Sequence, residues 1–353
     1  MKQRAIRHLD TGLSVLGHGC WPLGGSAYWG PREQADTDRI IARAIELGVN
    51  FFDTAEAYND GASEVSLARA LAGRRHEVLI GSKVQPGNAE EGRTRASLEA
   101  SLRRLETDYI DVYMLHWPLT AMWNGPRGEE ARRRTAAGEL RTLEEVCTEL
   151  ENARQEGLIR TWGVSNFGIE QLRELDALGF TPSVNQVAYS LVTRGAEIDV
   201  MPWCREHGIR IISYMSLMQG LFSDRLKRIE DLPPQRRRTR QYASGSGNDL
   251  VTHGGPGAED EVYVVLGTLR ELAGELGVTM AQLAIAWSMQ NEVVASTLVG
   301  ASSLAQIEAN AAAADLVIPA AAMERLDCAS KPVLDAIGPN IDYFQSAATS
   351  RSR

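Results

Sequence analysis

The chain has 353 residues, a formal net charge of −9 and 44% hydrophobic residues, a composition typical of a folded globular protein. The acidic excess argues against a protein whose surface as a whole binds nucleic acid or an anionic membrane. The densest apolar stretch, 209–218, is too short and too polar to span a membrane, and the N-terminus lacks the apolar core of a secretory signal. We therefore expect neither a nucleic-acid partner nor a membrane partner.

The four cysteines, Cys20, Cys147, Cys204 and Cys328, are widely scattered along the chain. Their spacing excludes a disulfide scaffold and a zinc ribbon and favours a reducing compartment. We therefore expect a cytoplasmic protein, and we assign no metal ligands.

Short β-branched runs alternate with longer amphipathic stretches along most of the chain. The pattern predicts strands at 16–20, 49–53, 77–81, 109–115, 158–164, 183–187, 209–214 and 295–299. It predicts helices at 34–47, 62–72, 91–106, 138–156 and 279–290. Repeated βα units require parallel strands with right-handed crossovers, and eight such strands close a barrel. We therefore predict an α/β protein, a (β/α)8 TIM barrel formed by a single domain over residues 1–353.

Segments outside the repeated βα units are expected to form additions to the barrel. The runs 5–7 and 13–15 flank Asp10-Thr11-Gly12, which predicts an N-terminal β-hairpin that plugs the barrel bottom. A smaller insertion, 118–137, follows the fourth strand, and a long loop, 223–258, follows the seventh. The long loop is either a surface insertion or a lid over the open end, since loops of this length are usually functional. The small, polar tail 338–353 is expected to be partly disordered.

Four side chains with chemical potential lie at the ends of three consecutive predicted strands. Asp53 ends the second strand, with Tyr58 five residues on; Lys83 ends the third, and His116 ends the fourth. Because the carboxyl ends of barrel strands meet at one face, these side chains are predicted to converge there.

Convergence of these groups would make an acid–base site. A free tyrosine has a pKa near ~10, and an adjacent ammonium lowers it. Lys83, held by Asp53, is predicted to lower the pKa of Tyr58. Tyr58 then exchanges a proton with a carbonyl or alcohol oxygen, which His116 orients.

Taken singly, each residue has an ordinary explanation. Asp53 can cap a helix, Lys83 can form a surface ion pair, and His116 can be a core histidine. A lyase that uses Lys83 as a Schiff-base nucleophile is a further reading, although a neighbouring carboxylate keeps the amine protonated.

The motifs around these residues resemble those of the aldo-keto reductase family over nearly the whole chain. The resemblance rests on Gly-Val-Asn-Phe-Phe-Asp-Thr-Ala-Glu-Ala-Tyr (48–58), Ile-Gly-Ser-Lys (80–83), Asp-Tyr-Ile-Asp-Val-Tyr-Met-Leu-His-Trp-Pro (108–118), Gly-Val-Ser-Asn-Phe (163–167) and Asn-Gln-Val-Ala-Tyr (185–189). It implies that Asp53, Tyr58, Lys83 and His116 form a catalytic tetrad. It also implies an NAD(P)-dependent oxidoreductase that acts on a small-molecule carbonyl or secondary alcohol, with a sugar or cyclitol as one expected substrate class.

The same resemblance implies a nicotinamide site, with NADP(H) as the favoured cofactor. The implied cofactor-binding residues are Gly19, Cys20, Trp21, Asp53, Ser165, Asn166, Gln186, Tyr214, Ser216, Leu217, Gln219, Gly220, Gly300, Ser302, Gln306 and Asn310. Ser302 stands where many relatives carry Arg or Lys for the 2′-phosphate, so NAD(H) use is also open. The arginine run 236–240 either compensates from the long loop or is a solvated charged surface.

An aromatic substrate pocket is expected at the barrel mouth. Its predicted lining is Trp21, Tyr28, Trp29, Tyr58, His116, Trp117, Trp123 and Phe222. The alternative function for such a barrel is a cofactor-binding regulatory or scaffold subunit with negligible turnover, because fold alone does not fix function.

Overall fold

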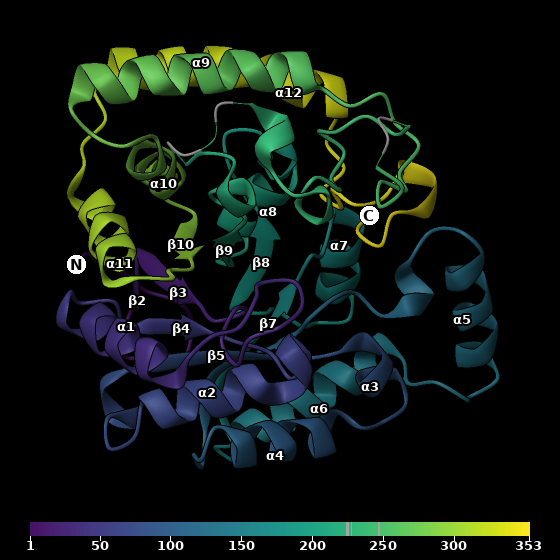
Figure 1. Cartoon of the computed structure of the whole chain (residues 1–353). Coiled ribbons are helices and arrows are strands. Elements are labelled where there is room, and N and C mark those ends of the chain that lie inside the picture. The colour runs from purple at the N-terminus through teal and green to yellow at the C-terminus, as the bar shows by residue number, and fades with distance from the viewer. Residues whose placement is uncertain (224–225, 227, 246–247) are drawn as a thin grey trace.

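The computed structural model describes residues 1–223, 226, 228–245 and 248–353. Its parallel strands close a barrel in the order β10-β3-β4-β5-β6-β7-β8-β9 (Figure 1). The strands are β3 Leu16–Gly19, β4 Phe51–Asp53, β5 Leu79–Val84, β6 Ile110–Leu115, β7 Ile159–Ser165, β8 Val184–Ala188, β9 Arg210–Tyr214 and β10 Val294–Val299. The predicted (β/α)8 barrel is confirmed.

Helices surround the barrel between successive strands (Figure 1). They are α1 Gln34–Glu46, α2 Ala62–Ala70, α3 Pro86–Glu90, α4 Thr94–Arg104, α5 Pro126–Ala136, α6 Leu143–Gln155, α7 Ile169–Ala177, α8 Val200–Glu206, α9 Glu259–Leu276, α10 Met280–Gln290, α11 Leu304–Ala312 and α12 Ala320–Ile337. Helix α6 begins five residues later than predicted, because Thr142 and Glu145 form a capping box at its start. The insertion 118–137 contains α5.

The barrel interior is filled by side chains rather than left as a channel. The ring of Phe51 occupies the space left by two strand glycines, since a Cβ on Gly81 would lie 2.8 Å from that ring and one on Gly17 would lie 3.1 Å away. Phe51 packs in one buried cluster with Met114 and Ile212 from other strands. This close packing fixes the strand register, which in turn sets where each strand ends.

The N-terminal hairpin exists, but its first strand lies earlier in the chain than predicted. Strand β1, Gln3–Arg4, pairs antiparallel with β2, Leu13–Ser14, so the first arm lies before residues 5–7. The Arg4 guanidinium donates to the carbonyl oxygens of Asn291 at 3.0 Å and Met289 at 2.7 Å, which anchors this arm at the β10 entrance. Leu13 and Ile6 join the interior cluster, so the hairpin does plug the bottom.

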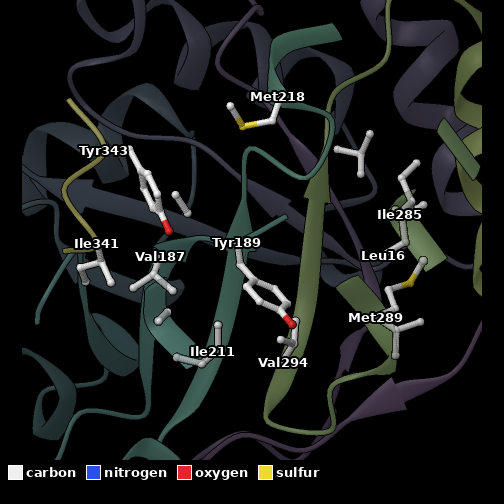
Figure 2. Close-up of a cluster of buried hydrophobic side chains, with 14 of the residues drawn as sticks. Leu16, Val187, Tyr189, Ile211, Met218, Ile285, Met289, Val294, Ile341 and Tyr343 are labelled. Carbon is white, nitrogen blue, oxygen red and sulfur yellow. The ribbon is translucent and has the colours of Figure 1, made fainter. Parts of the chain in front are cut away.

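A second core lies between the strands and the outer helices and includes part of the tail. Figure 2 shows Tyr343 and Ile341 in the same buried cluster as Val187 of β8. The Tyr343 hydroxyl oxygen accepts a hydrogen bond of 2.8 Å from the backbone N–H of Gly195. Farther on, Arg351 pairs with Asp342 at 2.8 Å. The tail 338–353, expected to be partly disordered, therefore has defined contacts, because the side chains of Ile341 and Tyr343 are buried in this core.

The long loop 223–258 leaves the carboxyl end of β9 and leads into α9. Its described residues include two short 3-10 turns, Ile229–Asp231 and Pro234–Arg236. Helices α9 and α12 lie side by side beyond it (Figure 1). Within the described ranges, no helix combines the length and the apolar character needed to cross a bilayer.

Candidate active site

The four predicted catalytic side chains meet at the carboxyl ends of neighbouring strands. Asp53 ends β4, Lys83 lies in β5, and His116 directly follows β6. Tyr58 begins a short 3-10 helix, Tyr58–Gly61, a few residues after β4. Parallel register between these strands brings the three strand-end residues to one edge.

Lys83 is the centre of this group. Its Nζ lies 2.7 Å from Asp53 Oδ2, 2.7 Å from the carbonyl oxygen of Thr54 and 3.3 Å from the hydroxyl oxygen of Tyr58. The Lys83 side chain is 0% exposed and that of Asp53 is 3% exposed. The three acceptors match the three N–H donors of an ammonium group, so the lysine is held in a single orientation.

The acid–base properties differ from the expectation in one respect. Burial, together with the charges of Asp53 and Cys20, raises the pKa of Tyr58 well above its ordinary value. Desolvation and the nearby carboxylate therefore outweigh the lowering expected from Lys83. Burial also lowers the pKa of Lys83, and the charge of Asp53 opposes this shift. Tyr58 is thus a neutral phenol, a group with a proton to give.

His116 faces the same phenol. Its ring lies edge-on to the Tyr58 ring, with the centroids 5.6 Å apart. Burial, and secondarily the charge of Lys83, lowers the pKa of His116 well below its ordinary value, so the imidazole is neutral. Its buried Nδ1 finds no hydrogen-bond partner among the described residues.

Asp53 has a second partner from the opposite side of the barrel. Gln186 of β8 donates from Nε2 to Asp53 Oδ1 at 2.7 Å. Both carboxylate oxygens are therefore engaged, one by Lys83 and one by Gln186. Sequence reasoning connected Gln186 with the cofactor alone, because a contact between residues 133 positions apart leaves no local signal.

Residues expected to bind the nicotinamide form a connected hydrogen-bond network. Asn166, in the left-handed region at φ 64°, donates from Nδ2 to the carbonyl oxygen of His116 and to Ser165 Oγ, both at 3.0 Å. The Tyr214 hydroxyl donates to Asn166 Oδ1 at 2.6 Å, and Ser352 Oγ in the tail donates to the Asn166 carbonyl oxygen at 2.6 Å. The network fixes the β7 loop beside the tetrad.

Two further loops complete the expected cofactor set. After β9, Ser216 Oγ donates to the Leu298 carbonyl oxygen at 2.9 Å, and the backbone turns through positive φ at Gln219 and Gly220. Leu217 lies between them, partly buried. After β10, Gly300 lies beside Gly19, since a Cβ on Gly300 would lie 3.5 Å from the Gly19 carbonyl oxygen.

The adenosine-end residues Ser302, Gln306 and Asn310 lie in the β10 loop and on α11. Gln306 Oε1 accepts from the Ser302 backbone N–H at 2.6 Å and from its hydroxyl at 2.8 Å. Asn310 donates to the Gly300 carbonyl oxygen at 3.3 Å.

The aromatic residues predicted to line the pocket separate into two groups. Trp21 stacks on Tyr28, with ring centroids 5.1 Å apart, and on Tyr58 at 5.9 Å, while Trp29 meets Trp21 edge-on at 5.2 Å. These rings form one layer over the tetrad. Cys20, by contrast, is fully buried.

The remaining predicted pocket residues make other contacts and lie outside this aromatic layer. Phe222 is fully buried in the outer core, so the structure does not bring it to the mouth surface. Trp123 donates from its indole nitrogen to the Pro118 carbonyl oxygen at 2.8 Å. The Arg351 guanidinium covers Trp117, 3.7 Å from its ring centroid.

Asn59 is a residue that sequence reasoning missed. It lies at φ 52°, and its Nδ2 donates to the carbonyl oxygens of Trp21 at 2.9 Å and Leu23 at 2.7 Å. The contact ties the aromatic first loop to the turn that carries Tyr58. Its only sequence signal was an Asn-Asp pair directly after Tyr58, a pair that tolerates left-handed backbone.

Comparison with known proteins agrees with this geometry. Residues 15–331 match the family model described as "Aldo/keto reductase family". Methylglyoxal reductase YeaE of Escherichia coli (strain K12) is 31% identical over 331 residues, covering 93% of this chain and 95% of that protein. A probable voltage-gated potassium channel subunit beta of Arabidopsis thaliana is 28% identical over 323 residues, covering 86% and 88%.

Solved structures give the same result. The crystal structure of an aldo-keto reductase from Klebsiella pneumoniae in complex with NADPH shares 28% identity at a TM-score of 0.68, and the match covers 93% of this chain and 95% of that one. The chain belongs to the aldo/keto reductase family. It is an NAD(P)H-dependent oxidoreductase.

The Tyr214 hydroxyl supplies a testable part of the network. Tyr214→Phe leaves Asn166 Oδ1 without this donor, so we expect the free energy of unfolding to fall by about 1 kcal/mol. Tyr242→Phe is the matched control, because the buried Tyr242 hydroxyl has no partner among the described residues. Urea denaturation measures both; equal stabilities of the two variants would contradict the role given to the Tyr214–Asn166 bond.

Proposed function

We propose that this protein reduces the carbonyl group of small aldehydes or ketones, with Tyr58 as the proton donor. The observation that carries the proposal is the buried Lys83 ammonium, bonded at once to Asp53, to the Thr54 carbonyl oxygen and to the Tyr58 hydroxyl. A phenol held in this way at the open end of a barrel is suited to proton transfer.

In the proposed reaction, the carbonyl carbon accepts a hydride and its two electrons, and the oxygen becomes negative. Tyr58 gives its proton to that oxygen, which yields the alcohol and leaves a phenolate. The Lys83 ammonium, 3.3 Å from the Tyr58 hydroxyl, stabilises the phenolate. The neutral His116 orients the carbonyl oxygen, and the reverse sequence oxidises an alcohol.

The residues at the mouth fit a nicotinamide cofactor, which supplies the hydride when bound. Gln186 Oε1 receives no hydrogen bond from the described residues and can accept one from a carboxamide. A Cβ on Gly220 would meet no atom within 4 Å, which leaves room beside the β9 loop. Ser165, Asn166 and Tyr214 would hold the ring end, whereas Ser302, Gln306 and Asn310 would hold the adenosine end.

Removing the proton donor tests the mechanism. Tyr58→Phe should lower turnover of an aldehyde by a factor of about 100 or more, while NADPH affinity stays within about twofold. Tyr263→Phe, an exposed tyrosine of α9, is the control. Steady-state kinetics and fluorescence titration measure the two quantities; wild-type turnover in Tyr58→Phe would end the assignment.

The raised pKa of Tyr58 predicts the pH dependence of each direction. Reduction needs the phenol, so its rate should stay flat from about pH 6 to pH 9. Alcohol oxidation needs the phenolate, so its rate should rise over the same range, by up to about tenfold per pH unit. His116 stays neutral throughout because its pKa is depressed. A reduction rate that falls with a midpoint near pH 7 would instead indicate a lowered tyrosine pKa.

Cofactor preference depends on Ser302, which is exposed and carries no charge. We propose NADP(H) as cofactor with weak discrimination against NAD(H). Ser302→Arg adds a bidentate partner for a 2′-phosphate, so the Kd for NADPH should fall about tenfold and that for NADH should stay constant. Ser302→Asn is the uncharged control. Equal changes for both cofactors would show that position 302 does not meet the 2′-phosphate.

The similarity to a channel subunit supports a second candidate, a cofactor-binding regulatory subunit. The intact group of Asp53, Tyr58, Lys83 and His116 favours the enzyme. NADPH binding without oxidation across a panel of aldehydes that includes methylglyoxal would favour the subunit. A sugar or cyclitol substrate, the single-domain organisation and the cytoplasmic location stay predictions.

A further inference from the structure

Two arginines of the long loop reach over the aromatic layer at the barrel mouth. The Arg236 guanidinium carbon lies 4.8 Å from the Trp29 ring centroid, and that of Arg238 lies 5.9 Å from the Tyr28 ring centroid. Directly before Arg236 in the chain, Gln235 lies with its carbonyl oxygen 3.1 Å from the Tyr28 hydroxyl, which also bonds to Gln219 Oε1. The loop is therefore fastened to the first loop.

The aromatic layer connects these arginines to the proposed proton donor. Trp29 and Tyr28 both contact Trp21, with ring centroids 5.2 and 5.1 Å apart. Trp21 in turn stacks on Tyr58 at 5.9 Å. The guanidinium groups thus lie one layer of rings away from the reacting end of the barrel.

No carboxylate of the described residues pairs with Arg236 or Arg238. The Nε of each is buried without a hydrogen-bond partner there, as are those of Arg237 and Arg240, and Arg238 also has a hydrogen bond with the Tyr28 hydroxyl. Both residues are half-buried, which does not fit a solvated charged surface. A half-buried charge without a partner is unfavourable unless a ligand supplies one.

Neighbouring arginines with a structural role look different. Arg240 donates from its guanidinium to the carbonyl oxygens of Ile337 and Asn340 at the end of α12. Arg351, which covers Trp117, is paired with Asp342. Arg240 and Arg351 thus have partners in the C-terminal part of the chain, whereas Arg236 and Arg238 lie over the aromatic rings at the barrel mouth.

The chemistry of a stacked guanidinium specifies the missing partner. When its face lies on an aromatic ring, its edge N–H groups remain for a planar or tetrahedral anion, in paired, charge-assisted hydrogen bonds. The whole chain carries a net charge of −9, so a local pair of cations at the mouth would attract anions to that one place.

We propose that Arg236 and Arg238 bind an anionic group of the substrate, so that the preferred carbonyl compounds carry a carboxylate or a phosphate. The inference rests on the proposed function and specifies its substrate class. It assigns the two arginines to substrate rather than to cofactor phosphates, because their contacts are with the first loop and the tail, whereas Ser302 and Gln306 lie on the β10 side. Among the described residues no hydrogen bond or ion pair joins Arg236 or Arg238 to Ser302 or Gln306, although Tyr28, under Arg238, also bonds to Gln219 of the expected cofactor set.

The decisive experiment compares matched substrate pairs with the full-length protein and NADPH. One pair is 4-oxobutanoate and its methyl ester; the other is glyceraldehyde 3-phosphate and glyceraldehyde. We expect kcat/KM to be at least about tenfold higher for an anionic member than for its neutral partner. A preference in the first pair alone specifies a carboxylate, and one in the second alone specifies a phosphate. Equal values in both pairs overturn the inference and leave the proposed function standing.

Variants locate the effect. Arg236→Gln/Arg238→Gln should lower kcat/KM for the anionic substrates by about tenfold or more and leave the neutral ones unchanged. Arg173→Gln is the matched control, since Arg173 also lies over a tryptophan, Trp203, but on α7. Equal losses on anionic and neutral substrates would mean that the arginines only hold the loop. A Kd for NADPH raised more than about tenfold would assign them to the cofactor; both results overturn the inference.

A binding measurement keeps the test independent of turnover. Succinate has no carbonyl group to reduce, and its titration should change tryptophan fluorescence saturably in the wild-type protein, through Trp29. The double variant should lose this change. Inorganic phosphate is titrated in the same way as the probe for a phosphate group. No saturable change in the wild type with either succinate or inorganic phosphate overturns the inference, whereas failure to reduce any of the four carbonyl compounds, with either anion still bound, counts against the proposed function alone.

Discussion

The Lys83 ammonium is fully buried, and its nearest charge is the equally buried Asp53 carboxylate. Such a pair is costly to bury and persists only when every remaining donor and acceptor is satisfied. Here the other two ammonium N–H groups go to the Thr54 carbonyl oxygen and to Tyr58, and the other carboxylate oxygen goes to Gln186. Well-packed apolar groups are often as stable in such positions, so the pair is consistent with the proposed chemical role of Lys83.

Satisfying that pair requires the closed barrel. Asp53 and Lys83 come from adjacent strands, but Gln186 comes from β8, across the cylinder. Only closure brings these strand ends together, and the register of β4, β5 and β6 is held by tight interior packing around Phe51. The plugged bottom and the proposed active site at the opposite end are therefore two consequences of one packing arrangement.

The sequence predicted what depends on local periodicity and on strand order. The β-branched runs and helix-stopping glycines predicted the barrel, and consecutive strand ends predicted that Asp53, Lys83 and His116 converge. The sequence could not predict contacts between distant segments. One example is the pair of hydrogen bonds from the Arg4 guanidinium to the carbonyl oxygens of Asn291 and Met289, which anchor the first strand of the hairpin earlier in the chain than predicted. Nor could it predict the direction of the Tyr58 pKa, because the sequence reveals charges but not the loss of water around them.

In the proposed function, the reaction depends on residues at the strand ends, whereas substrate specificity depends on the loops and the tail. The proposed proton-transfer groups lie on or beside strands, where packing fixes them, whereas the layer over them is made by three segments far apart in the chain. The first loop, the long loop and the tail hold one another: Tyr28 bonds to Gln235, the Arg238 guanidinium lies 5.8 Å from the Phe344 ring centroid, and Ser352 bonds to the loop of Asn166. Arg236 and Arg238 are separated from the Lys83 centre by the rings of Trp29, Tyr28, Trp21 and Tyr58, so we expect that their charges can change without disturbing that centre. A barrel built in this way can keep one reaction while its loops select the substrate.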